Sequence, residues 1–319
     1  MKRTGFLYDE RFLKHTTGPY HPECPERLTA IYQGIEQMGL LEHLTVIPAR
    51  PAERMWIELV HDKDYIDRFE AACQNGQKTF DSADNQMGPE TFEIALLAVG
   101  GILDTIDSII ADEIDNAFCA VRPPGHHAER SKAMGFCYFN NAAIAAVYLQ
   151  TKWFLQRVAI IDIDVHHGNG TAHIFEEDDT VYYFSIHQHP SFAFPGTGRA
   201  FDQGEKRGVG YTFNATVLPG QGDEVYREAI GGELATAIER FRPEFIIVSV
   251  GFDAHVDDDM SDIKLSTEAF SWIMQQVVAL ARQHSKGRVI SILEGGYSLK
   301  RLPELAANHV EILLNAELT

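Results

Sequence analysis

The stretch Val158-Ala-Ile-Ile-Asp-Ile-Asp-Val-His-His-Gly-Asn-Gly-Thr171 starts as an apolar run and ends in charged and polar residues. A short apolar run rich in β-branched residues is typical of a strand buried on both faces, as in a parallel sheet. Similar runs recur along the chain, with helix-like amphipathic segments between them. This alternation predicts an α/β fold with helices on both faces of the sheet. Strands are expected at 117–121, 158–163, 181–186, 245–250 and 289–293, and helices at 26–38, 89–110, 140–151, 223–240 and 267–283.

The composition is that of a globular protein with a large excess of acidic residues. The 319 residues include 27 Lys and Arg against 46 Asp and Glu, a formal net charge of −19, and 45% of them are hydrophobic. A general nucleic-acid binder needs a basic surface, so no direct contact with nucleic acid is expected. The charge is compatible with a cationic substrate or a basic partner, although an acidic surface commonly serves only solubility.

The cysteines and the apolar runs indicate the cellular compartment in which the protein is expected. Cys24, Cys73, Cys119 and Cys137 form neither a disulfide framework nor a CxxC zinc motif, which favours a reducing compartment. The N-terminus lacks a run of signal-peptide length, and no stretch approaches the roughly 20 apolar residues of a transmembrane helix. We therefore expect a cytoplasmic protein that does not span a membrane. Without low-complexity linkers or internal repeats, the chain is expected to form a single domain, residues 1–319.

Each predicted strand ends in a polar motif. Ligands of open α/β sheets bind at the carboxyl ends of the strands, so side chains from these motifs are expected to meet at one sheet edge. The convergence of His, Asp and Tyr residues favours a functional site over packing. The motifs are RPPGHHA at 122–128, DIDVHHGNGT at 162–171, HQHP at 187–190, GFDAHVDD at 251–258 and EGGY at 294–297.

Three of these polar residues have the pattern of a metal site. Asp162, Asp164 and His166 alternate along an extended segment, so they share one face of it. Carboxylate and imidazole donors suit a divalent metal such as zinc, and ferrous iron equally suits this ligand set. A further ligand should come from another strand end. The spacing leaves the choice open among Asp253, His255, Asp257, Asp258 and Asp259.

The other motifs offer acid–base groups. His126 and His127 are adjacent, so they are expected to have different environments, with Asp162 and Asn169 as candidate partners that fix their tautomers. Tyr297 follows two glycines and can donate a hydrogen bond to a developing oxyanion. Together these groups predict hydrolysis of an amide or ester by metal-activated water. The motifs of serine hydrolases, P-loop NTPases and dinucleotide enzymes are missing from the sequence.

With these motifs in order, the chain resembles the histone deacetylase family in its wide sense, which includes bacterial amidohydrolases. The resemblance implies the arginase–deacetylase fold, with about eight largely parallel strands sandwiched between helices. It spans most of the chain, which implies one catalytic domain. The pieces that carry it are HPECPER at 21–27, RPPGHHA at 122–128, GFCYFN at 135–140, DIDVHHGNGT at 162–171, FPGTG at 194–198, GFDAHVDD at 251–258 and EGGY at 294–297.

The resemblance also implies roles for single residues. The family's general base falls on His127 and its partner on His126, which Asp162 supports. Asn169 stands beside His127 where some members carry Asp, and this version resembles class II members. Tyr297 matches the tyrosine that stabilises the transition state. The implied zinc ligands are Asp164, His166 and Asp258.

The implied reaction is zinc-dependent removal of acetyl or short acyl groups from acetyl-lysine-like amines. An apolar tunnel with aromatic walls would suit the methylene stem of such a substrate. The implied tunnel and rim residues are Gly135, Phe136, Phe194, Leu265, Met260 and Asp84. Structural K⁺ or Na⁺ sites are implied at Asp162, Asp164, His166, Ser185 and Ile186, and at Phe175, Asp178, Val181 and Tyr211.

Two other functions stay open. An acetylpolyamine amidohydrolase fits the acidic charge, but Met260 stands where polyamine-preferring relatives can carry an acidic residue. A non-catalytic module on the same fold is disfavoured because the implied catalytic residues are all present. A two-metal arginase would want a further Asp at Gly168. The physiological substrate, the acyl length and the metal used in the cell stay open, and the sequence is compatible with a homo-oligomer.

Overall fold

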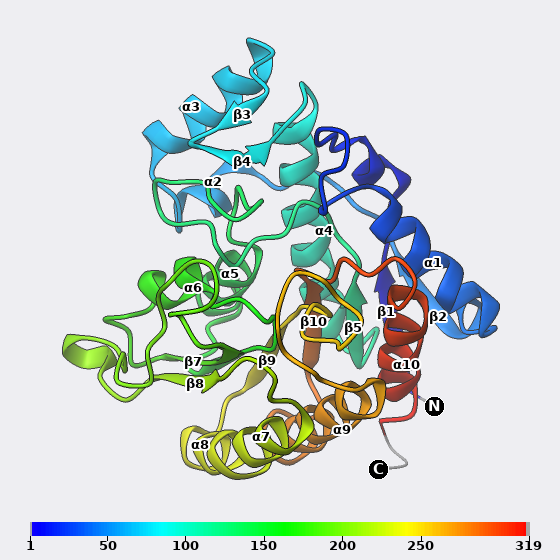
Figure 1. Cartoon of the computed structure of the whole chain (residues 1–319), viewed down its shortest axis with the longest axis vertical. Helices are drawn as coiled ribbons and strands as arrows, with labels where there is room; N and C mark the ends of the chain where they lie inside the picture. Colours follow the sequence, from blue (N-terminus) through cyan, green and yellow to red (C-terminus); the bar gives the residue numbers. More distant parts are fainter. Residues whose placement is uncertain (1, 317–319) are drawn as a thin grey trace.

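Eight parallel strands form the central sheet of the computed structural model, which describes residues 2–316 (Figure 1). All of the pairings between neighbouring strands of this sheet are parallel. The predicted α/β class and strand number are confirmed. In spatial order the strands are β2 (Leu44–Ile47), β1 (Thr4–Leu7), β5 (Asn116–Cys119), β10 (Val289–Leu293), β9 (Phe245–Val250), β6 (Val158–Asp162), β7 (Val181–Gln188) and β8 (Thr212–Val217).

Helices flank the sheet in two groups (Figure 1). One group contacts the sheet through α4 (Thr91–Ile110) and α5 (Asn141–Trp153), which also pack on each other. The other contains α1 (Glu26–Gln37), α9 (Thr267–His284) and α10 (Leu302–Leu314), with α10 between its two neighbours. Shorter helices are α2 (Arg54–Glu58), α3 (Lys63–Gln74), α6 (Asn169–Ile174), α7 (Asp223–Glu228) and α8 (Ala235–Phe241), and β3 (Thr79–Phe80) pairs with β4 (Ser82–Gln86).

The five predicted strands are all present, whereas β1, β2 and β8 were not predicted. β1 and β2 have only four residues each, and the middle of β2 is exposed, so neither forms a long apolar run. β8 lies at the other edge of the sheet and alternates polar with apolar residues. The helix predicted at 223–240 contains a π-helical segment, Ala229–Leu234, between α7 and α8.

Helix α5 shows how the sequence brings a helix close to the sheet. It contacts β6 and β9, and its buried residues include Ala142, Ala143, Ala145 and Ala146. Methyl side chains let the helix lie close to the strands, and alanine has the highest intrinsic helix propensity. The Asn140 side chain accepts a hydrogen bond from the backbone N–H of Ala143 at 3.0 Å and so begins the helix directly after the GFCYFN motif.

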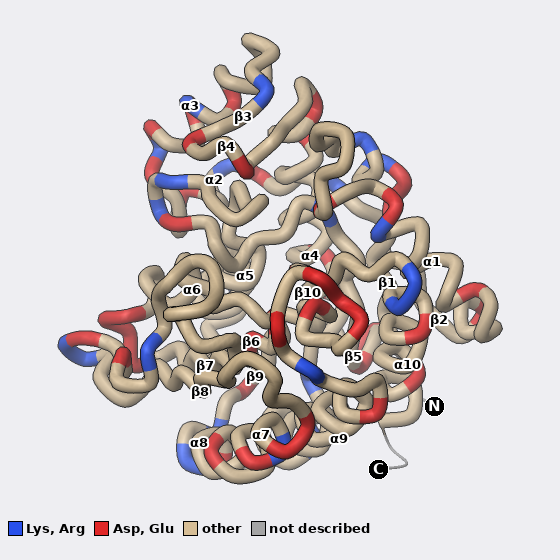
Figure 2. Tube along the Cα trace, in the orientation of Figure 1, with Lys and Arg blue, Asp and Glu red and all other residues tan. Residues whose placement is uncertain are grey.

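Acidic residues occur on most surface elements, and one run of them lies in the loop that follows β9 (Figure 2). Within the described part of the chain, the helices include none with the length and apolarity needed to cross a membrane.

His309 on α10 makes the fold sensitive to acid. It is buried between the rings of Phe118 and Phe252, at centroid distances of 5.2 and 6.0 Å, and burial lowers its pKa from 6.5 to about 3. Below pH 6.5 the unfolded chain takes up a proton that the folded chain refuses, so stability falls as the pH drops towards 3.

We expect His309→Leu to remove this part of the acid sensitivity. Between pH 7.5 and pH 5 the variant should lose about 2 kcal/mol less free energy of unfolding than the wild type, because the two pKa values differ in this range. Urea unfolding at both pH values measures the difference, with the exposed His43→Leu as control. An unchanged pH dependence in His309→Leu would contradict this account.

Candidate active site

Three buried donor groups converge at the carboxyl ends of β6 and β9. Asp164 and His166 follow β6, and Asp253 follows β9, its neighbour in the sheet. One donor atom from each lies within 4.8 Å of the others, and this is the single cluster of its kind within residues 2–316. A carboxylate, an imidazole and a second carboxylate are the ligand types of a catalytic zinc site.

The electrostatics of the cluster favour a cation. Burial would lower the pKa of His166, but the Asp164 and Asp253 carboxylates raise it to about 10 because they attract positive charge. Asp253 Oδ1 accepts a hydrogen bond from the Val165 N–H at 3.0 Å, and its buried Oδ2 lies 3.3 Å from His166 Nδ1. Two buried carboxylates around one imidazole leave an excess of negative charge, so these residues fit a divalent metal ion.

Two glycines make room for the converging carboxylates. A Cβ atom on Gly295 would lie 2.1 Å from Asp253 Oδ2 and 2.6 Å from Asp164 Oδ2, and one on Gly251 would lie 2.2 Å from Asp164 Oδ2. The glycines of the EGGY and GFDAH motifs therefore leave the carboxylates space to approach each other.

We expect Gly295→Ala to weaken metal binding at least about tenfold, because the added methyl group displaces ligand carboxylates. Competition with a chromophoric chelator measures the affinity directly. Gly232→Ala is the matched control, since a Cβ atom there would meet nothing within 4 Å. Equal affinities in the two variants would show that Gly295 has no part in shaping the site.

Asp258, the remaining zinc ligand implied by the resemblance, does not belong to this cluster. Its Oδ2 accepts hydrogen bonds from the backbone N–H groups of Tyr297 and Ser298 at 2.6 and 2.8 Å, and its Oδ1 accepts one from Met260 at 3.1 Å. Asp258 lies further along the loop, whereas Asp253 lies beside the strand end. Asp253, one of the candidates left open by the spacing, instead lies beside Asp164 and His166.

The tandem histidines contact each other and have opposite protonation tendencies. Their ring centroids lie 4.0 Å apart. His126 Nδ1 lies 3.0 Å from Asp162 Oδ2, and His127 Nδ1 lies 2.7 Å from Asn169 Oδ1, so both predicted pairings are present. Burial would lower the pKa of His126, but the carboxylates of Asp162 and Asp164 raise it to about 10. Burial and the neighbouring charge of His126 hold the pKa of His127 well below its usual value.

Glu294 is a buried residue of the site to which the sequence reasoning assigned no role. Its Oε2 accepts hydrogen bonds from the backbone N–H groups of Gly125 and His126 at 2.6 and 3.1 Å, and its Oε1 accepts one from Ser249 Oγ at 3.0 Å. Glu294 thus ties the histidine loop to the ends of β9 and β10. Its position at the start of the EGGY motif could have identified it as a residue of the site.

Arg27 was also missed, although the HPECPER motif contains it. It donates hydrogen bonds to the carbonyls of Gly296 and Glu294, both at 2.6 Å, and its guanidinium lies 4.9 Å from the centroid of the Tyr297 ring. Burial raises the pKa of Tyr297 well above its usual value although Arg27 opposes the rise, so the phenol stays protonated. Glu23 pairs with Arg27 at 3.0 Å from within the same buried cluster.

Most residues of the predicted tunnel lie near these groups. The Phe194 ring centroid is 4.9 Å from that of His127, and the Phe136 ring centroid is 6.1 Å from that of Tyr297. Gly135 has a φ of +57°, and a Cβ atom there would lie 2.3 Å from the His127 ring. Its N–H donates to Asp84 Oδ2 at 3.1 Å, so the rim Asp is tied to the tunnel wall.

Two other predicted tunnel residues have different surroundings. Leu265 is fully buried in the hydrophobic core and pairs through its backbone with Ala254 and Val256, which favours a packing role. Met260 is half-buried in the loop that Asp258 fastens to Tyr297.

The residues implied for the two monovalent-cation sites lie around β6 and β7. Asp162 and Ser185 are direct neighbours on these strands. In the second group, the Phe175 carbonyl accepts a hydrogen bond from the Asp178 N–H at 3.0 Å, and the Tyr211 carbonyl accepts one from Tyr183 at 2.8 Å. Each carbonyl keeps a second lone pair, and cation binding here stays a prediction.

The chain is similar to several known proteins. Residues 21–313 match the family model described as the histone deacetylase domain. The chain is 36% identical to the histone deacetylase-like amidohydrolase of Pseudomonas aeruginosa, over 95% of this chain and 83% of that protein. It is 37% identical to the polyamine deacetylase HDAC10 of Mus musculus, over 92% of this chain and 45% of that protein. The crystal structure of the HDA15 HD domain superimposes with a TM-score of 0.92 at 34% identity, covering 98% of this chain and 88% of the other.

Proposed function

The chain belongs to the histone deacetylase family, and on that premise we propose that it is a zinc-dependent amidohydrolase that removes acetyl or short acyl groups from acetyl-lysine-like amines. The observation that carries the proposal is the convergence of Asp164, His166 and Asp253 beside the pair of His127 and Asn169. The reaction consumes one water and yields a carboxylate and a free amine.

Asp164, His166 and Asp253 would hold the metal ion, zinc or ferrous iron, through two carboxylates and one imidazole. When bound, the ion supplies a Lewis acid that polarises the acyl carbonyl and the attacking water.

The two histidines have different roles in the proton transfers. Asn169 Oδ1 can only accept, so His127 Nδ1 donates to it and leaves Nε2 unprotonated. The low pKa of His127 keeps this nitrogen available to take a proton from the attacking water. His127 then gives this proton to the amine nitrogen as the C–N bond breaks, and the positive charge of His126, held by the Asp162 carboxylate, assists departure of the amine. Glu294 keeps both rings in place through the backbone of the loop.

Tyr297 stabilises the negative charge that develops on the acyl oxygen. Its phenol stays protonated and can donate a hydrogen bond there. Arg27 lies against its ring, and Asp258 holds its backbone N–H. Phe136 and Phe194 would line the sides of an aliphatic stem.

An acetylpolyamine amidohydrolase is the second candidate. The net charge of −19 favours a cationic substrate, and one similar protein is named a polyamine deacetylase. The neutral Met260 at the loop beside the site favours acetyl-lysine.

A comparison of kcat/KM on an acetyl-lysine peptide and on acetylputrescine tests the proposal, with and without prior chelation of metal. We expect turnover of the peptide that chelation abolishes and zinc restores. A large excess for acetylputrescine would select the second candidate, and chelator-resistant turnover would overturn the metal mechanism.

The remaining expectations are proposals with narrower support. The family match over 21–313 supports one catalytic domain. All four cysteines are unpaired, which supports a reducing compartment such as the cytoplasm. We propose that the carbonyl groups near Asp162 and Phe175 bind K⁺ or Na⁺ as structural ions.

A further inference from the structure

The pair of His127 and Asn169 is connected to a carboxylate that the mechanism above does not use. Glu129 follows the tandem histidines, and its Oε1 accepts a hydrogen bond from Asn169 Nδ2 at 2.5 Å. The same carboxylate lies 2.9 and 3.0 Å from His173 Nδ1 through its two oxygens. A chain of hydrogen bonds therefore runs from His127 through Asn169 and Glu129 to His173.

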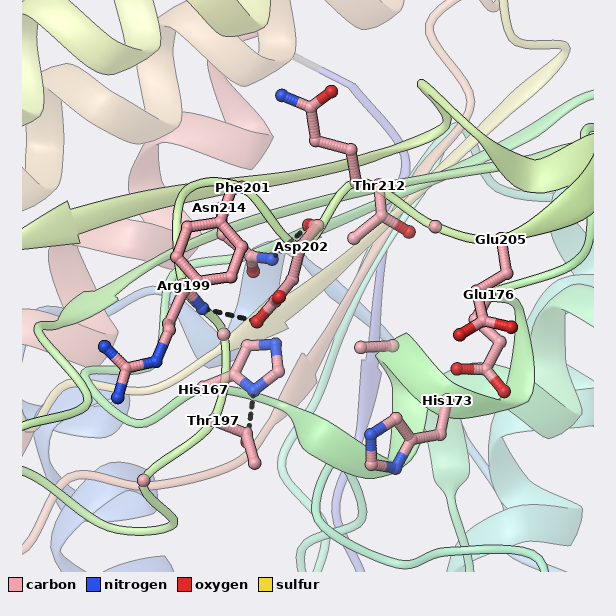
Figure 3. Close-up of a pocket in the computed structure, with 15 residues that line it drawn as sticks. His167, His173, Glu176, Thr197, Arg199, Phe201, Asp202, Glu205, Thr212 and Asn214 are labelled. Atoms are coloured by element: carbon pink, nitrogen blue, oxygen red, sulfur yellow. Dashed lines mark hydrogen bonds between the residues drawn. The ribbon is translucent and has the colours of Figure 1, made fainter.

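The outer end of this chain lies at the surface. His173, near the end of α6, has a side chain that is 50% exposed, whereas that of Glu129 is only 20% exposed. The hydrogen bond to Glu129 raises the pKa of His173. His173 also lines a cavity of about 540 Å³, on the same side as Glu176 (Figure 3). Glu129 thus stands between the buried general base and a group in contact with water.

Glu129 decides which way the Asn169 amide faces. An amide has a donor end and an acceptor end, so alone it could present either to His127. A carboxylate can only accept, so Asn169 Nδ2 must face Glu129, and Oδ1 then faces His127 Nδ1 at 2.7 Å. The His127 carbonyl and the Met134 sulfur, each 3.3 Å from Nδ2, are weaker acceptors. This orientation selects the Nδ1–H tautomer of His127 and leaves Nε2 free.

The backbone around Glu129 is held by a buried histidine. The carbonyl of Glu129 lies 2.9 Å from His61 Nδ1, and its N–H donates to the Lys132 carbonyl at 2.9 Å. His61 is 2% exposed, and burial lowers its pKa to about 4, so it is neutral. Its Nε2 accepts a hydrogen bond from the Asn140 N–H at 2.9 Å, which leaves Nδ1 as the donor to Glu129. The position of Glu129 therefore does not depend on its side-chain contacts alone.

We propose that Glu129 is a positioning residue for the general base: it orients the Asn169 amide and so fixes His127 in the tautomer that can take a proton from water. The inference rests on the proposed function and deepens it, because it assigns control of this tautomer to a residue outside the catalytic set. A carboxylate at position 169 would need no such partner, since both of its oxygens accept.

Glu129→Lys tests the proposal, because an ammonium group can only donate. We expect it to attract Asn169 Oδ1, turn Nδ2 towards His127 and lower kcat on an acetyl-lysine peptide at least about 100-fold, since the wrong histidine tautomer is catalytically costly. KM should change less than about threefold. His173→Gln is the matched control. It breaks the same ion pair but keeps Glu129, so kcat should stay within about threefold of the wild type.

A second variant separates this role from a general loss of structure. In Glu129→Lys/Asn169→Asp, the carboxylate at position 169 can accept both from the lysine and from His127 Nδ1. We expect the double variant to regain at least about tenfold in kcat over Glu129→Lys. Thermal unfolding checks that each variant is folded.

NMR of the full chain with ¹⁵N-labelled histidine reports the tautomer of His127 without any turnover, and His127→Ala identifies its signals. We expect Nδ1–H in the wild type and Nε2–H in Glu129→Lys. The proposal is overturned if His127 keeps the Nδ1–H tautomer in Glu129→Lys, if His173→Gln lowers kcat as much, or if the folded double variant regains nothing. A wild type without turnover would contradict the proposed function, while the tautomers would still decide the role of Glu129.

Discussion

Replacement of Asp253 by Asn is expected to abolish stable metal binding, with a loss of affinity of at least about 100-fold. The amide keeps an oxygen for the Val165 N–H, which the carboxylate accepts at 3.0 Å, so the fold should persist. It lacks the negative charge that, with Asp164, raises the pKa of His166 to about 10. Metal content after dialysis, measured by atomic emission, is the primary result, and deacetylase activity should fall with it.

Asp258→Asn is the matched control for this prediction. Its carboxylate accepts hydrogen bonds from the Tyr297 and Ser298 N–H groups, so we expect this variant to keep its metal. Its kcat should fall, because the backbone that carries Tyr297 is held less firmly. Loss of metal from Asp258→Asn, with retention in Asp253→Asn, would restore the assignment implied by the family resemblance and refute the one from the structure.

His127→Ala is expected to lower kcat by about 10²- to 10⁴-fold, which is the usual contribution of a general base. Metal content and KM should change little, because His127 is neither in the ligand cluster nor paired with a ligand. Single-turnover measurements on an acetyl-lysine peptide separate the chemical step from binding. The surface variant His43→Ala controls for removal of an imidazole. A His127→Ala enzyme that retained a tenth of its kcat would assign the base to another group.

Much of the fold was predictable from local patterns. The strands at 245–250 and 289–293 have the bounds that their apolar runs predict, because both faces of these central strands are buried. The edge strands β2 and β8 do not form long apolar runs, because part of each strand is exposed to water or covered by loops. The pattern of apolar residues in a sequence reflects burial. It therefore identifies the central strands of a sheet more readily than the edge strands.

The residues of the candidate site also differ in how well the sequence predicts their positions. Asp164 and His166 could be placed together because they are close in sequence, but the strand ends at Asp162, which pairs with His126 and lies outside the cluster. The pairing of His127 with Asn169 followed from residue chemistry. The choice between Asp253 and Asp258 depended on the path of the loop after β9, which no spacing rule describes. Strand ends are positioned by the sheet, whereas a residue five positions further on is positioned by its own contacts.

The hydrogen bond from Arg27 to Gly296 joins residues 269 positions apart. Arg27 lies in the first turn of α1, and the tyrosine that it contacts, Tyr297, follows β10. During synthesis Gly296 is added 269 residues after Arg27, and contacts between such distant residues form slowly. Chains that end before β10 are therefore expected to contain Asp164 and His166 but to lack Tyr297, the proposed oxyanion donor, and so to be inactive.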